Sequence, residues 1–150
     1  MNEPDQMTFT AQQAYEFGFG PLCVWREARS VGYQGMLAVA WTFNNRQDHP
    51  SIFGHDWPSV IEARYQYSSM SPTDPQFRKF PASPDPSWMC ALRESIDAFT
   101  RQVPDPTNGS TMYYDDSISA PDWAKDGSHV ATVKIGPLNF FKVVPGRGPV

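Results

Sequence analysis

The 150-residue sequence contains only two cysteines and three histidines, and neither type forms a recognisable motif. Cys23 and Cys90 lie in apolar stretches of helical character, so free buried thiols are expected, although a bridge between them stays open. There is no HExxH or CxxC pattern, and His49, His55 and His129 are scattered rather than set at ligand spacing. The sequence therefore predicts no bound metal and no cofactor.

Basic residues and long apolar runs are also scarce. The 12 Lys and Arg against 16 Asp and Glu leave a net charge of −4, and no Lys/Arg-rich run is present, which argues against nucleic-acid partners. The longest apolar run, Met36–Trp41, is far shorter than the ~18 residues of a membrane span, so no membrane insertion is expected. The acidic start, Met1–Gln6, lacks the features of a secretory signal, which predicts synthesis in the cytoplasm.

Proline and aromatic residues, by contrast, are abundant, with 15 prolines and 14% aromatic side chains. The length and the 40% hydrophobic content predict one domain, residues 1–150, with its own core, and we expect a monomer. The prolines predict long ordered loops. A loop over residues 64–86 exceeds the ~12–15 residues usual in a compact domain, which favours a functional role.

Hydrophobic spacing predicts helices in the first two thirds of the chain. A first segment, beginning at Thr10, should be interrupted at Gly18-Phe19-Gly20. Helical patterns then follow at residues 22–29, 34–46 and 57–63. A further helix should begin at Asp85-Pro86 and stop before Pro104. Its apolar face would carry Trp88, Leu92, Ile96 and Phe99.

Strand patterns follow at residues 111–114, 130–135 and 138–144. The last two are joined by Gly136-Pro137, which is typical of a hairpin turn. The expected fold class is therefore α+β, mostly helical with a small antiparallel C-terminal sheet.

Glu27 is the residue with the most unusual setting. Its helical neighbours three and four positions earlier are Val24 and Cys23, so its carboxylate lies on an apolar face. Burial raises the pKa of a carboxyl group, which a general acid near neutral pH requires. The alternative is an ordinary ion pair with one of three arginines: Arg26, Arg29 or Arg46.

Around Glu27 the chain resembles the SleB-like cell-wall hydrolases, named for the spore-cortex-lytic enzyme. Trp25–Arg29, Gly35–Ala40 and Asn45-Arg46 are similar to the family's opening "EAR … EGQxAVAxVxxNR". Further motifs follow in the family's order over about residues 22–142: Gln66–Ser68 for "QFS", Asp105–Tyr114 for "DPTxGAxxY", then Trp123, Ile135-Gly136 and Phe140-Phe141 for the closing strands. The sequence departs from the pattern at Ser30–Tyr33, where a second acidic residue is usual, and at Leu138, where a histidine is usual.

The resemblance implies a lysozyme-like domain that cleaves the glycan strands of peptidoglycan, with Glu27 as catalytic acid and base. Aromatic, amide and hydroxyl groups would bind the sugars along the groove, although aromatic residues are equally common in cores. The expected substrate-binding residues are Gln66, Ser68, Tyr113, Tyr114 and Trp123.

The expected reaction is cleavage of the MurNAc–GlcNAc β-1,4 bond by a lytic transglycosylase, since among the five glutamates only Glu27 stands in a catalytic-looking block. A hydrolytic muramidase would need a second carboxylate, for which Asp115, Asp116 and Asp122 are candidates. The sequence also leaves open an N-acetylmuramoyl-L-alanine amidase and, from another class of protein, a non-catalytic peptidoglycan-binding or virion domain. The expected setting is a phage or prophage endolysin, made in the cytoplasm and released to the wall through a holin.

Overall fold

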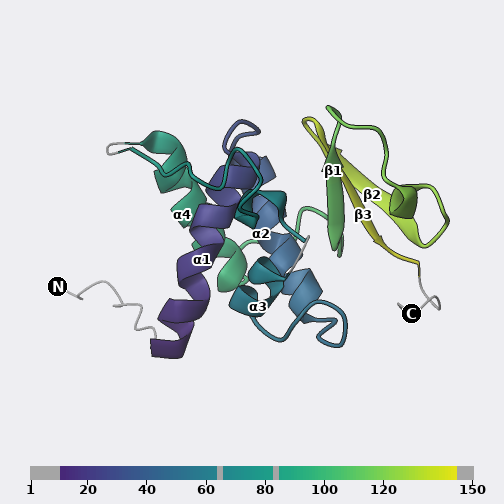
Figure 1. Cartoon of the computed structure of the whole chain (residues 1–150). Helices are drawn as coiled ribbons and strands as arrows, with labels where there is room; N and C mark the ends of the chain where they lie inside the picture. Colours follow the sequence, from purple (N-terminus) through teal and green to yellow (C-terminus); the bar gives the residue numbers. More distant parts are fainter. Residues whose placement is uncertain (1–10, 64–65, 83–84, 145–150) are drawn as a thin grey trace.

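The computed structural model describes residues 11–63, 66–82 and 85–144. Figure 1 shows the helices grouped together and a small sheet beside them. The helices are α1 (Ala11–Ala28), α2 (Tyr33–Gln47), α3 (Trp57–Glu62) and α4 (Pro86–Phe99), with short 3-10 turns at Ser68–Met70 and Asp122–Ala124. Thr10, the predicted start of the first helix, lies outside the described residues.

Helix α2 forms the centre of the helical part, because its side chains are buried continuously from Gly35 to Arg46. Phe43 packs edge-on against the rings of Trp57 and Tyr67, with centroids 5.0 and 5.1 Å away. The indole N–H of Trp57 donates to the side-chain oxygen of Asn44 over 3.0 Å, so this buried polar pair is satisfied. The helix predicted over residues 34–46 from the spacing of apolar residues is confirmed.

The predicted interruption at Gly18-Phe19-Gly20 is wrong, since α1 runs without a break through these residues and through Pro21. Gly20 lies directly against α3: a Cβ there would be 2.4 Å from Cζ3 of Trp57. Its glycine therefore allows a close approach of two helices rather than a turn. Local sequence cannot distinguish these two uses of glycine.

Helix α4 begins as predicted. The Asp85 carboxylate accepts hydrogen bonds from the backbone N–H groups of Ser87 and Trp88, and Pro86 occupies the first turn. The predicted apolar face is only partly buried, whereas the neighbouring stripe with Ala91 and Ala98 is fully buried. Small side chains let the backbones of α4, α1 and α2 approach closely, which explains why this stripe forms the contact.

The sheet is antiparallel, with strand order β1-β3-β2. Its strands are β1 (Met112–Asp115), β2 (His129–Ile135) and β3 (Leu138–Val143), and β2 and β3 are joined by the predicted turn, where Gly136 has φ 55°. Tyr113 pairs with Phe140 across β1 and β3, and Phe140 is fully buried. The α+β prediction, mostly helical with a C-terminal sheet, is confirmed.

Two further predictions concerned the cysteines and membrane insertion. Cys23 and Cys90 are both free thiols; Cys23 is buried and Cys90 is partly exposed. Among the described residues, no helix combines the length and the apolar character needed to cross a bilayer.

Candidate active site

A groove of about 560 Å³ opens where the last turn of α1 meets β1 and the segment that follows α3. All six residues predicted for the site line this groove, although they come from four separate parts of the chain: Glu27, Gln66, Ser68, Tyr113, Tyr114 and Trp123. The structure thus brings the predicted residues together at one surface. Their individual roles stay predictions.

Glu27 lies in the last turn of α1, partly exposed at the groove. The Tyr113 hydroxyl donates to its Oε1 atom over 2.7 Å. Burial raises the pKa of Glu27, while hydrogen bonding from Tyr113 and the nearby Ser69 favours the charged form, and the negative charge of Asp74 adds to the increase. The net shift of the Glu27 pKa is upward, which is the direction that a proton-donating carboxyl group requires.

The alternative of an ion pair between Glu27 and a neighbouring arginine is not seen among the described residues, where the ion pairs are Arg101–Asp48 and Lys134–Asp116. Arg26 instead donates to the carbonyl of Lys79 over 3.1 Å, and Arg29 donates to Oε1 of Gln76 over 2.6 Å. The arginines beside Glu27 therefore contact the loop that contains Gln76 and Lys79, and neither forms an ion pair with Glu27.

Arg46 determines how Gln66 is presented to the groove. Arg46 is 2% exposed, and its guanidinium donates to the carbonyl of Thr111 over 2.6 Å and to Oε1 of Gln66 over 3.1 Å. Because the Gln66 oxygen accepts from Arg46, the amide N–H₂ of Gln66 is the group left to donate to a ligand. The same arginine joins α2 to the start of β1.

The aromatic residues of the site divide into two groups. Tyr113 packs between Tyr67 and Phe140, with centroids 6.4 and 5.4 Å away, so its ring belongs to the wall beneath Glu27. The ring centroids of Tyr114 and Trp123 lie 6.0 Å apart, and Tyr114 also stacks on Phe141. This second pair offers ring faces and edges suited to sugar binding.

The three aspartates considered as a second carboxylate differ in position. Asp115 lines the groove, and its carboxylate accepts from the Ser117 N–H over 2.8 Å. Asp116 is held by Lys134 and Asn139, and neither it nor Asp122 lines the groove. Of the three, only Asp115 is placed near the candidate chemistry.

Several groove residues were missed by sequence reasoning. These are Arg26, Ser30, Arg46, Asp74, Gln76, Met112, Ser117, Ile118, Pro121 and Leu138. Asp74 and Gln76 lie in the long loop whose length predicted a functional segment, so the segment was indicated although its individual residues were not. Arg46 belongs to the Asn45-Arg46 motif, which supported the family resemblance but did not predict that Arg46 lines the site.

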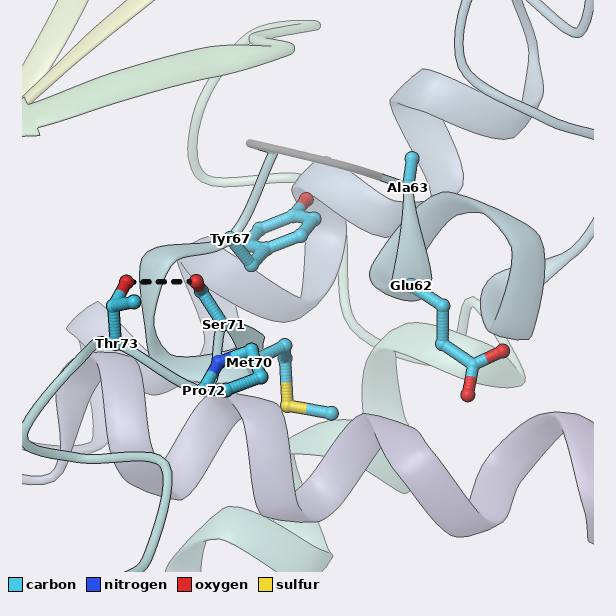
Figure 2. A pocket seen from close by; sticks show the side chains of 7 residues that line it. All are labelled: Glu62, Ala63, Tyr67, Met70, Ser71, Pro72 and Thr73. Atoms are coloured by element: carbon cyan, nitrogen blue, oxygen red, sulfur yellow. Dashed lines mark hydrogen bonds between the residues drawn. The ribbon is translucent and has the colours of Figure 1, made fainter.

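A second pocket, of about 410 Å³, lies on another side of the Tyr67–Thr73 segment (Figure 2). Glu62 and Ala63 of the α3 end face it from one side, and Ser71 and Thr73, joined by a 3.1 Å hydrogen bond, form the other. Its lining shares none of the six predicted residues. We take the groove at Glu27 as the candidate active site, because it combines a carboxyl group of raised pKa with all six residues predicted for the site.

Metal binding finds no support in the residues described, since no group of three or more His, Cys, Asp or Glu side chains there is placed to hold an ion. A carboxyl group of raised pKa, in a groove that also holds Asp74, Asp115 and aromatic side chains, is instead typical of enzymes that cleave glycosidic bonds with acid catalysis. That class agrees with the comparisons with known proteins.

The model of the cell wall hydrolase family matches residues 30–141, and the chain belongs to this family. The match begins after Glu27, so it does not itself assign that residue. Among solved structures, the chain is similar to the catalytic domain of the Bacillus cereus SleB protein, at 22% identity and a TM-score of 0.67, with 93% of this chain and 94% of that chain covered.

The catalytic domain of the germination-specific lytic transglycosylase SleB from Bacillus anthracis is similar at 21% identity and a TM-score of 0.67, covering 91% of this chain and 99% of that chain. A comparison with curated proteins gives no match. The lysozyme-like α+β fold and the SleB-like family predicted from the sequence are both confirmed.

Proposed function

We propose that this cell wall hydrolase is a lytic transglycosylase that cleaves the MurNAc–GlcNAc β-1,4 bond of peptidoglycan, with Glu27 as its acid and base. The observation that carries the proposal is the setting of Glu27: burial raises its pKa, Tyr113 donates to one of its oxygens, and no arginine of the described residues forms an ion pair with it. The similar Bacillus anthracis domain belongs to a lytic transglycosylase, which supports the same reaction.

In the first step, the protonated carboxyl of Glu27 gives its proton to the glycosidic oxygen, the C1–O bond breaks, and positive charge develops at C1 of the muramic acid. In the second step, the Glu27 carboxylate takes the proton of the C6 hydroxyl as that oxygen bonds to C1. The product ends in 1,6-anhydro-muramic acid, and no water is consumed. Because the nucleophile belongs to the same sugar, its attack needs no separately bound water.

The Tyr113 hydroxyl fits both steps. It donates to Oε1 of Glu27 over 2.7 Å, so it stabilises the carboxylate that forms between the two proton transfers. The other oxygen, Oε2, is the one that exchanges the proton with the substrate. Gln66, through its amide N–H₂, and the Tyr114 and Trp123 rings would bind neighbouring sugars of the strand.

A hydrolytic muramidase is the second candidate, because Asp115 lines the same groove and could activate water. The two reactions differ in one product. Purified peptidoglycan is digested with the protein, and the fragments are separated and weighed by mass spectrometry without chemical reduction. The proposal predicts fragments that lack one water and carry no reducing muramic acid. Free reducing muramic acid, together with loss of activity in Asp115→Asn, would support the muramidase instead.

The biological setting is a separate proposal. An endolysin of a phage or prophage that reaches the wall through a holin is the expectation from the sequence. Its test is independent of the chemistry: lysis of cells that make the protein should require co-expression of a pore-forming holin. Lysis without one would contradict this setting.

A further inference from the structure

The loop between α3 and α4 brings a further carboxylate, besides Glu27 and Asp115, into the active-site groove. Between residues 71 and 80 the chain forms successive tight turns, closed by hydrogen bonds such as Asp74 N–H to Ser71 O at 3.0 Å and Phe77 N–H to Asp74 O at 3.1 Å. Asp74 and Gln76 are partly buried and line the groove, while Pro75 between them is exposed. The turns therefore direct these two polar side chains inward.

This loop is tied to the same helical turn that carries Glu27. Arg29 donates to the Gln76 side-chain oxygen over 2.6 Å, and the Gln76 backbone N–H donates to the Asp74 carboxylate over 2.8 Å. Arg26 donates to the Lys79 carbonyl and lies 4.9 Å from the centre of the Phe80 ring. Since both arginines flank Glu27 in α1, these contacts define the position of Asp74 relative to Glu27.

Asp74 is also electrostatically distinct among the groups around Glu27. The titratable groups facing Glu27 from α1, the Gln66–Met70 segment and β1 are Cys23, Tyr67 and Tyr113, and burial raises the pKa of all three, so they are uncharged near neutral pH. The charged groups of the groove are Arg26, Arg46, Asp74 and Asp115. In the part of the chain that the structure describes, Asp74 forms no ion pair, and its negative charge is one of the causes, after burial, that raise the pKa of Glu27.

We propose that Asp74 is a further catalytic residue, whose carboxylate faces the reacting sugar and stabilises the positive charge that develops at C1 as Glu27 protonates the glycosidic oxygen. No bond to Asp74 forms: the proton passes from Glu27 to the leaving oxygen and returns from the C6 hydroxyl. A fixed negative charge beside the reacting carbon lowers the energy of the transition state more than that of the neutral ground state. The inference rests on the proposed glycan cleavage but not on the fate of the C6 hydroxyl.

The test compares Asp74→Asn with the wild type by steady-state kinetics on peptidoglycan fragments across pH. We expect kcat to fall roughly 10²-fold with a small change in KM, because the missing charge acts on the transition state. The descending limb of the pH profile, which reports the protonated form of Glu27, should move to lower pH, because loss of a neighbouring negative charge lowers the pKa of Glu27. Asp74→Glu should restore much of this shift.

Asp116→Asn is the matched control, since Asp116 is paired with Lys134 outside the groove; its kcat and pH limb should equal those of the wild type. The proposal would be overturned if Asp74→Asn kept the wild-type kcat, or if its kcat fell while the descending limb of its pH profile stayed at the wild-type pH. Either result would leave the loop with a structural role. Carbon NMR titration of the Glu27 carboxyl in both proteins measures the effect of the Asp74 charge on the pKa of Glu27 without an activity assay. If the NMR titration of Glu27 is the same in Asp74→Asn as in the wild type, the proposal is also overturned. Fragments with free reducing muramic acid from the wild type would contradict only the transglycosylase reaction, not the role of Asp74.

Discussion

The hydrogen bond between Tyr113 and Glu27 offers a quantitative test of how the site works. Tyr113→Phe removes the donor to Oε1 and leaves the ring in contact with Phe140 and Tyr67. A hydrogen bond to a charged group contributes about 1.5–3 kcal/mol, and each ~1.4 kcal/mol of lost transition-state stabilisation slows a reaction tenfold. The variant should therefore cleave about 10- to 100-fold more slowly.

The pH dependence of Tyr113→Phe should also change in a definite direction. The Tyr113 hydroxyl favours the charged form of Glu27, so its loss raises the pKa of Glu27 further, and the descending limb of the pH profile should move to higher pH. This is the opposite direction from Asp74→Asn, which makes the pair of variants informative. The measurement is kcat against pH on peptidoglycan fragments, with thermal unfolding as the control for folding. A folded Tyr113→Phe protein with an unchanged rate and an unmoved limb would refute the assignment.

Three other predictions address neighbouring features. Gln66→Ala should weaken cleavage and lower the free energy of unfolding by about 1 kcal/mol, because buried Arg46 loses an acceptor. Gln66→Glu keeps that acceptor, so in urea unfolding it should be as stable as the wild type, while its activity should stay low. Gly20→Ala should cost ~1–3 kcal/mol in the same assay, since its Cβ would lie 2.4 Å from the Trp57 ring; unchanged stability would contradict this contact. EDTA should leave the lysis rate unchanged; loss of lysis restored by zinc would indicate a metal enzyme.

Much of the fold could be predicted because its signals are local. The spacing of apolar residues in α2, the Asp85-Pro86 start of α4 and the Gly136-Pro137 turn each depend on a few adjacent residues. The prediction failed at Gly18-Phe19-Gly20, where the deciding contact is with Trp57, far along the chain. The buried stripe of α4 was missed for the same reason: helix contacts favoured small alanines over the larger apolar side chains.

The site was predictable to the extent that its residues stand in motifs. Glu27 was predicted as the catalytic residue from its apolar neighbours and from the block around it, and it lines one groove with the five predicted binding residues. Its contact with Tyr113 joins residues 86 positions apart, so no local pattern could reveal it. Asp74 stands in a Pro- and Ser-rich loop without periodicity, and only the folded chain places it in the same groove as Glu27.

The most direct test of the account is the lytic activity of Glu27→Gln. This change replaces the ionisable carboxyl with an amide of nearly the same shape, which can still accept from Tyr113 but cannot transfer a proton at neutral pH. General acid–base assistance is typically worth ~10²–10⁴-fold, so turbidity of a suspension of purified peptidoglycan should stay almost constant with the variant while it falls with the wild type. The melting temperatures of the two proteins should be similar. A folded Glu27→Gln protein that keeps more than about a tenth of the wild-type rate would contradict the central role of Glu27.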